Sequence, residues 1–150
     1  MTAADVDQPP LPRRLQVEVT AACNLRCRMC IVRYRPAFPR SASMTLRRFE
    51  RLLDALPSVR EVVLQGVGEP LLAPDLYDMI AATTARGIDV EFNSNATLLT
   101  RAAWERLIAA GLAALHLSLD GSRQGDLRGH PRRSALKPRR QYRRVRRAAA

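Results

Sequence analysis

The three cysteines of this chain, Cys23, Cys27 and Cys30, all lie within one eight-residue segment. Three thiolates on one short loop can hold three corners of an iron–sulfur cube and leave the fourth iron without a protein ligand. A small molecule could bind that open iron and receive an electron there. An odd number of clustered cysteines argues against a disulfide framework. The segment therefore predicts a metal-binding loop in a reducing compartment, for which the cytoplasm is the consistent choice.

Zinc is the main alternative for this loop. Structural zinc usually takes four protein ligands, often as two pairs of cysteines. The chain has no fourth cysteine, and its histidines, His116 and His130, lie far from the loop in sequence. A zinc site would need one of them to return to the loop, whereas His116 reads better as a hydrogen-bonded interior histidine. The residues favour iron–sulfur chemistry and leave zinc open.

The elements that would position this loop follow from the spacing of the apolar residues. Alternating residues predict strands, and apolar residues at helical spacing predict helices that end at Pro57, Gly87 and Gly111. The expected strands span 15–20, 61–65, 88–94 and 115–120, and the expected helices span 45–56, 75–86 and 100–110. Strands and helices that alternate in this way predict an α/β fold with neighbouring parallel strands and right-handed crossovers. Four such strands are consistent with a partial (β/α) barrel.

Polar side chains share one face on three of the expected strands. A parallel strand that is buried on both sides should be almost entirely apolar. The polar residues in question are Glu18 and Thr20, then Glu91, Asn93 and Asn95, then His116, Ser118 and Asp120. This pattern predicts a lumen that serves as a binding site. The alternative is that this face of an open sheet points to solvent.

Four segments together resemble the radical S-adenosylmethionine (radical SAM) superfamily. Residues 15–30, LQVEVTAACNLRCRMC, resemble its opening strand and cluster loop, and residues 66–72, GVGEPLL, are similar to its glycine–glutamate–proline motif. Residues 94–96, SNA, resemble its threonine–asparagine–glycine segment, with Ala96 where glycine is usual. Residues 117–121, LSLDG, resemble its fourth-strand motif. The nearest members resemble molybdenum-cofactor synthases and peptide-maturing enzymes.

The resemblance implies an enzyme with two cofactors, a 4Fe-4S cluster and S-adenosylmethionine. It makes Cys23, Cys27 and Cys30 the cluster ligands. Reductive cleavage of S-adenosylmethionine would give a 5′-deoxyadenosyl radical that takes a hydrogen atom from a substrate, which the sequence does not identify. The expected partner is a reductant similar to flavodoxin or ferredoxin.

The resemblance also assigns cofactor-binding roles to residues outside the cysteine loop. Gly66, Gly68 and Glu69 would recognise the methionine amino group, because glycines permit close approach of the backbone and a carboxylate accepts hydrogen bonds from an ammonium. Ser118 and Asp120 would bind the carboxylate or ribose side of S-adenosylmethionine, and Asn95 would line the same mouth of the binding site. Simple turns are the alternative for the glycines and for the segment at Asp120.

The charge of the chain is concentrated at its end. The net charge is +11, yet residues 1–121 carry 14 basic and 13 acidic residues, whereas residues 122–150 carry 11 basic residues and one acid. We therefore divide the chain into an irregular lead-in (1–14), a partial radical SAM domain (15–121) and a basic tail (122–150) that should be disordered.

Three explanations compete for this tail. It could bind nucleic acid through phosphate contacts, it could be a solvated appendage, or the reading frame could be lost after Asp120. The last implies a truncated chain without activity, since this family's partial barrel has about six strands. A second class of function also stays open, a small zinc-binding, nucleic-acid-binding module with a basic arm. No apolar run approaches the ~20 residues of a membrane span, and no secretory signal is evident.

Overall fold

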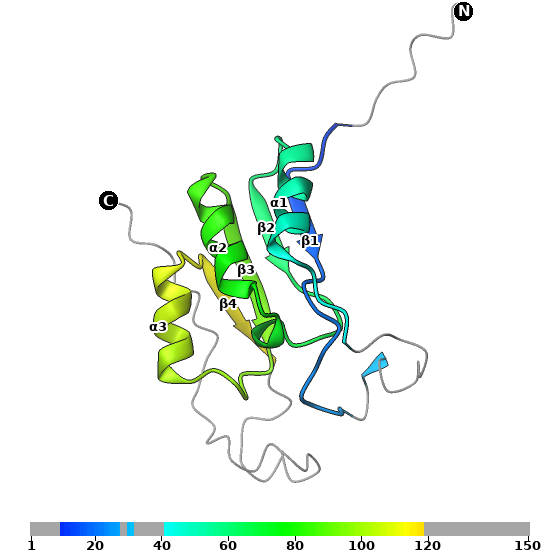
Figure 1. Ribbon diagram of the computed structural model, residues 1–150, viewed down its shortest axis with the longest axis vertical. Helices are drawn as coiled ribbons and strands as arrows, with labels where there is room; N and C mark the ends of the chain where they lie inside the picture. Colours follow the sequence, from blue (N-terminus) through cyan, green and yellow to red (C-terminus); the bar gives the residue numbers. More distant parts are fainter. Residues whose placement is uncertain (1–9, 28–29, 32–40, 119–150) are drawn as a thin grey trace, which may run out of the picture.

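The computed structural model describes residues 10–27, 30–31 and 41–118, and within them it places four parallel strands in one sheet (Figure 1). The strands are β1 (Arg14–Val17), β2 (Glu61–Leu64), β3 (Asp89–Ser94) and β4 (Ala114–Leu117). The helices are α1 (Leu46–Ala55), α2 (Leu76–Ala85) and α3 (Arg101–Ala109), with a short 3₁₀ turn, η2 (Pro70–Leu72). The predicted α/β fold is confirmed.

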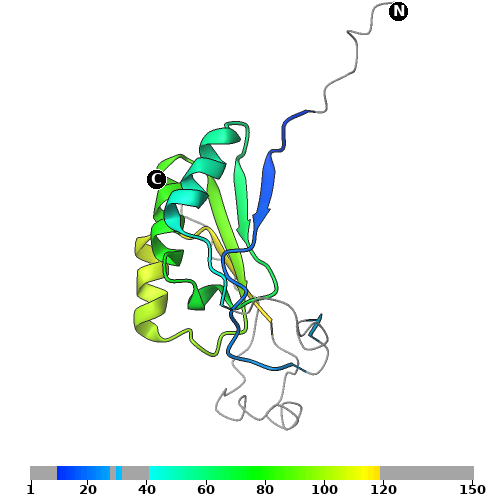
Figure 2. The same cartoon turned by 45° about the vertical axis from the view of Figure 1, so that its right-hand side comes forward.

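The order of the strands in the sheet is their order in the chain. Every neighbouring pair is parallel, with Val17 beside Leu64, Leu64 beside Phe92, and Phe92 beside Leu115. A helix connects each strand to the next, and the described helices all lie on the same face of the sheet (Figures 1 and 2). This is the arrangement of consecutive β/α units expected for part of a (β/α) barrel.

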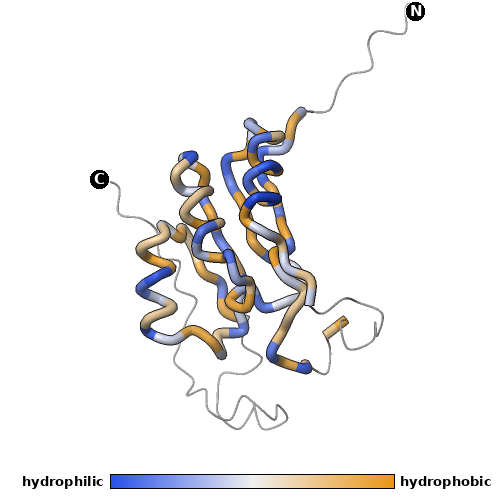
Figure 3. Tube along the Cα trace, viewed as in Figure 1, coloured by the Kyte–Doolittle hydropathy of each residue, from blue (hydrophilic) through white to orange (hydrophobic). Residues whose placement is uncertain are grey.

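The hydrophobic core lies between the sheet and these helices. Hydrophobic and hydrophilic residues alternate along the helices and strands (Figure 3). The strands contribute Val62, Leu64, Val90 and Phe92, and the helices contribute Phe49, Leu76, Met79, Ile80 and Leu107, all of them fully buried. At about 25 cal/mol per Å² of apolar surface, burial of these side chains is the main force that holds the helices on the sheet.

The helix ends agree with the sequence in all but one detail. Thr100 caps α3, since its hydroxyl accepts a hydrogen bond from the Ala103 N–H at 3.1 Å. Gly87 (φ +69°) and Gly111 (φ +88°) follow α2 and α3 in the left-handed conformation. Thr45, the expected cap of α1, makes no side-chain cap bond.

The first strand is shorter than predicted because the chain changes its pairing partner. Residues 19–21 leave the sheet and pair with residues 42–44 in antiparallel fashion. The Ala21 N–H donates to the Ala42 carbonyl, and the Met44 N–H donates to the Val19 carbonyl, both at 2.9 Å. The hydroxyls of Thr20 and Ser43 lie 2.8 Å apart. Thr20 is therefore buried against this segment.

The fourth strand and the chain ends can be compared with the sequence predictions only in part. The fourth strand begins at Ala114 and ends at Leu117, and residues 119–120 of the expected strand lie outside the described residues, as do the lead-in to residue 9 and the basic tail.

None of the helices that the structure describes is both long and apolar enough to cross a lipid bilayer.

Candidate functional site

The cysteine loop extends from the carboxyl end of the sheet. After Val17 the chain continues past the ends of the strands into the loop (Figure 2). Cys23 is exposed, whereas Cys27 and Cys30 are half-buried. The Cys30 N–H donates to the Cys27 carbonyl at 3.2 Å. The carboxyl ends of parallel strands are where barrel enzymes place their functional groups.

The cysteine side chains are not gathered around a common centre in this structure. Among the described residues, no three His, Cys, Asp or Glu side chains are arranged to hold a metal ion. The donors nevertheless suit an iron–sulfur cluster, since they are three sulfur ligands on one accessible loop and a cluster binds cysteine thiolates. The cysteines therefore suit a cluster by their sulfur donors and by their position at the carboxyl end of the sheet.

The loop after β2, residues 66–70, packs directly against the segment that leads to the cysteines. A Cβ atom on Gly68 would lie 2.1 Å from the Thr20 carbonyl oxygen and 2.7 Å from that of Ala22. A Cβ atom on Gly66 would instead meet the side chain of Glu18, at 2.3 Å from its Cγ. The Glu69 N–H donates to the Ala22 carbonyl at 2.7 Å. Gly68 is thus required for contact between two backbones.

Glu69 is a buried carboxylate, only 2% exposed, that is held by three hydrogen bonds. Its Oε1 accepts from the Ser94 hydroxyl at 2.8 Å and from the Leu71 N–H at 3.2 Å. Its Oε2 accepts from the Asn95 N–H at 2.7 Å. The carboxylate therefore joins the loop after β2 to the end of β3. Ser94 was not predicted as a site residue, because its side chain is on the strand face opposite the predicted polar face.

Asn95 lies at the end of β3 and contacts the cysteine loop. It is 8% exposed, and its side-chain Nδ2 donates to Oδ1 of Asn24 at 3.0 Å. Thr97 completes this contact, since its hydroxyl accepts from Asn24 Nδ2 at 2.7 Å. Asn24 and Thr97 were not predicted from the sequence. The available signal was the presence of short polar side chains next to Cys23 and next to Asn95.

The turn between Asn95 and Thr97 uses an unusual backbone conformation. Ala96 has φ +62° and is the only described residue other than glycine with a positive φ. The family that the sequence resembles usually has glycine at this position, and glycine adopts this conformation without steric cost. The Ala96 N–H donates to the Ser94 hydroxyl at 3.0 Å, which helps to hold the turn.

The remaining predicted cofactor residues lie at the end of the fourth strand. Ser118 is exposed, and its N–H donates to the Ser94 carbonyl at 2.9 Å. This bond keeps Ser118 beside the carboxyl end of β3, where the loop after β2 also lies. Asp120 lies outside the described residues.

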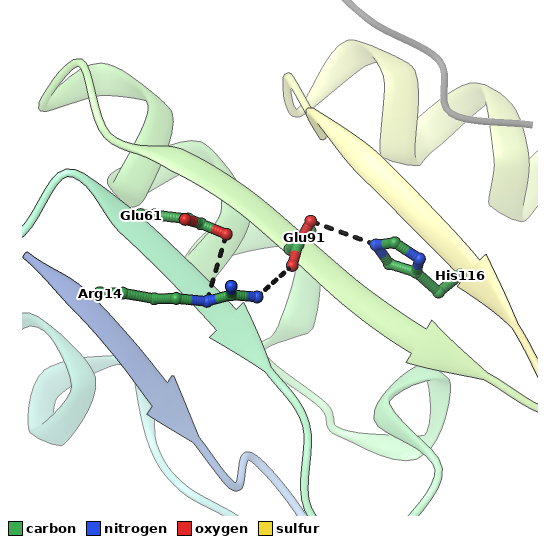
Figure 4. A network of polar contacts seen from close by, with 4 residues as sticks. All are labelled: Arg14, Glu61, Glu91 and His116. Carbon is green, nitrogen blue, oxygen red and sulfur yellow. Dashed lines mark hydrogen bonds and ion pairs between the residues drawn. The ribbon is translucent and has the colours of Figure 1, made fainter.

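The polar face of the sheet carries a second group of residues, on the side that the described helices leave uncovered (Figure 4). Glu91 lies between Arg14 Nη2 at 2.9 Å and His116 Nε2 at 3.1 Å, and Arg14 Nε lies 3.3 Å from Glu61. Arg14 and Glu61 are the first residues of their strands, so the group extends towards the end of the sheet opposite the cysteine loop. Glu91 and His116 share a face as predicted, and they bind each other.

Comparison with known proteins agrees with this arrangement. The family model of the radical SAM superfamily matches residues 17–150. This chain belongs to the radical SAM superfamily. The GTP 3′,8-cyclase of Rhodococcus opacus is 38% identical over 114 residues, which are 72% of this chain and 32% of that protein. The mycofactocin maturase MftC of Mycobacterium tuberculosis is 30% identical over 112 residues, which are 74% of this chain and 28% of that protein.

The solved structures support the fold. The crystal structure of Streptococcus suis SuiB bound to the precursor peptide SuiA matches with a TM-score of 0.65 at 22% identity, over 78% of this chain and 26% of that chain. The predicted membership is confirmed, and a GTP cyclase and a peptide maturase among the relatives agree with the predicted nearest members. The chain spans less than a third of the length of these curated relatives.

Proposed function

We propose that Cys23, Cys27 and Cys30 bind a 4Fe-4S cluster whose fourth iron takes S-adenosylmethionine. The observation that carries this proposal is the position of the cysteine loop, which lies at the carboxyl end of a parallel sheet and is bonded to the loop after β2 through Glu69 and Ala22. When bound, the cluster supplies the electron that cleaves S-adenosylmethionine and generates the 5′-deoxyadenosyl radical for hydrogen abstraction from a substrate. In this proposal the chain is the cofactor-binding part of an enzyme.

The residues around the loop would bind and orient S-adenosylmethionine. Gly66, Gly68 and Glu69 are proposed to hold its methionine amino group. Glu69 already accepts three hydrogen bonds from the protein, so it would also keep the loop after β2 fixed against β3. Ser118 and Asp120 are proposed for the carboxylate or ribose side, and Asn95 is proposed to line the same mouth, which agrees with the bond between Ser118 and Ser94 at the end of the neighbouring strand.

The proposal also names a partner and a compartment. The electron must come from outside the chain, so a one-electron donor similar to flavodoxin or ferredoxin is the proposed partner. The thiolates must stay reduced until the cluster is inserted, which fits the cytoplasm. Nucleic-acid binding through residues 122–150 remains a prediction from their charge.

Anaerobic reconstitution of the purified chain with iron and sulfide tests the cluster directly. We expect about four irons and four sulfides per chain, with the broad visible absorption of thiolate-bound iron. Cys27→Ala should lose most of this iron, because a three-thiolate site with one ligand missing no longer holds the cube. Arg26→Ala is the matched control, since it changes an exposed neighbour in the same loop.

The metal analysis also separates the two classes of function. One zinc per chain, without sulfide, would support the zinc-binding module and contradict the cluster. Full iron retention in Cys27→Ala would also contradict the proposal. These readouts depend on binding alone, so they apply even if this part of the enzyme has no turnover by itself.

A further inference from the structure

Asn24 directly follows Cys23 in the cysteine loop, yet its side chain bonds to the end of the third strand. Its Nδ2 donates to the Thr97 hydroxyl at 2.7 Å, and its Oδ1 accepts from Asn95 Nδ2 at 3.0 Å. These bonds join residues that are 73 and 71 positions apart in the sequence. Among the described residues 23–27, and leaving Cys27 aside, no other side chain is hydrogen-bonded to a residue outside the cysteine loop.

The three side chains form a closed ring of hydrogen bonds. The Thr97 hydroxyl accepts from Asn24 and donates to Oδ1 of Asn95, which also accepts from the Thr97 N–H at 2.9 Å. Each of the three side chains both donates and accepts a hydrogen bond within the ring. Because Asn95 is buried and the other two are half-buried, water competes poorly for these bonds. A partly shielded, satisfied network of this kind fixes side-chain positions.

Further hydrogen bonds hold the strand side of this ring. The Asn95 N–H is held by Glu69 at 2.7 Å, and the turn at Ala96 is held by the Ser94 hydroxyl at 3.0 Å. The loop side is the part that carries the thiols. Asn24 therefore fixes the start of the cysteine loop to the end of β3. This contact lowers the conformational entropy that the loop must lose on binding a ligand.

We propose that Asn24 and Thr97 are positioning residues for the iron–sulfur cluster. They hold the first part of the cysteine loop in place through Asn95 and do not touch the cluster themselves. This inference rests on the proposed function, because it assigns these residues to the same cluster site. Partners that orient metal ligands from outside typically change metal affinity 10- to 100-fold when they are replaced.

The test uses reconstituted chains and measures iron retention. We expect Asn24→Ala and Thr97→Val to release iron to a competing chelator at least ~10 times faster than the unaltered chain. Thr97→Ser keeps the hydroxyl and should restore slow release. Thermal unfolding of the metal-free chains measures the stability lost with the ring, so that iron release is compared among chains that are all folded. The electron paramagnetic resonance signal of the reduced cluster should broaden in Asn24→Ala, since the loop then adopts several conformations.

The outcomes distinguish this inference from the function on which it rests. If Asn24→Ala and Thr97→Val release iron at the rate of the unaltered chain, the positioning role is wrong while the cluster assignment stands. If Thr97→Ser releases iron as fast as Thr97→Val, the hydroxyl does not act as proposed. If the unaltered chain itself binds no iron under any reconstitution condition, the cluster assignment fails and the positioning role fails with it.

Discussion

The glycines of the loop after β2 show how single residues set the geometry of this site. Both were predicted from a motif, but the structure gives them different neighbours. Gly68 faces backbone carbonyl oxygens of residues 20 and 22, whereas Gly66 faces the flexible side chain of Glu18. A side chain can rotate away from an added methyl group, and a hydrogen-bonded backbone cannot do so without moving the loop that leads to the cysteines.

Gly68→Ala should therefore lower the free energy of unfolding by about 1–3 kcal/mol, the usual cost of overpacking. Gly66→Ala is the matched control and should cost less, because Glu18 can adopt another rotamer at the expense of one exposed hydrogen bond, from the Val67 N–H at 2.7 Å. Urea unfolding followed by circular dichroism measures both. Equal losses for the two variants would show that backbone contact at Gly68 does not limit stability.

The sequence offered candidate site residues but not the contacts that the structure gives them. Cysteine spacing predicted cluster ligands at Cys23, Cys27 and Cys30, the motif after the second strand predicted a cofactor role for Glu69, and these roles stay predictions. The hydrogen bond between buried Glu69 and Ser94 joins residues 25 positions apart, and no local sequence pattern encodes such a bond. Asn24 escaped prediction for the same reason, because its partners are at the end of another strand.

At the scale of elements, apolar periodicity predicted the helices well, since each has one face in the core. The end of β1 was not predictable from alternation alone. Residues 18–20 continue the alternating pattern, but residues 19–21 pair with residues 42–44, which precede α1. Pairing with a distant segment thus overrides the local signal.

The start of α1 depends on a residue from another element. The Leu46 N–H donates to Asp75 Oδ2 at 2.8 Å, so the carboxylate that precedes α2 satisfies a donor at the amino end of α1. Asp75→Ala should cost about 1 kcal/mol of stability, as loss of a capping side chain usually does. The exposed Asp78 of α2 provides the control, and Asp78→Ala should cost less. Thermal unfolding compares the two, and similar losses would contradict the capping role.

At the scale of the whole molecule, the two faces of the sheet differ in kind. One face is the apolar core beneath the helices, and the other carries the group Arg14, Glu61, Glu91 and His116 (Figure 4). The sequence predicted a polar face, and the structure pairs its charges with one another. This group lies away from the cysteine loop, so we assign it to the cohesion of neighbouring strands.

Arg14→Gln tests this assignment. The Arg14 side chain is 62% exposed, so its ion pairs are screened and should contribute less than ~1 kcal/mol. The loss should shrink further at high salt, and iron retention after reconstitution should not change. A large loss of iron in Arg14→Gln would place this group in the cofactor site.

The closed ring between the cysteine loop and the third strand has a consequence for biosynthesis. Ribosomes make the thiols early, but the partners that immobilise them come 71 to 73 positions later. A nascent chain that stops before Thr97 would present its sulfurs on an untethered segment. Delivery of iron and sulfide is therefore best matched to a chain whose first three strands have already been translated and folded.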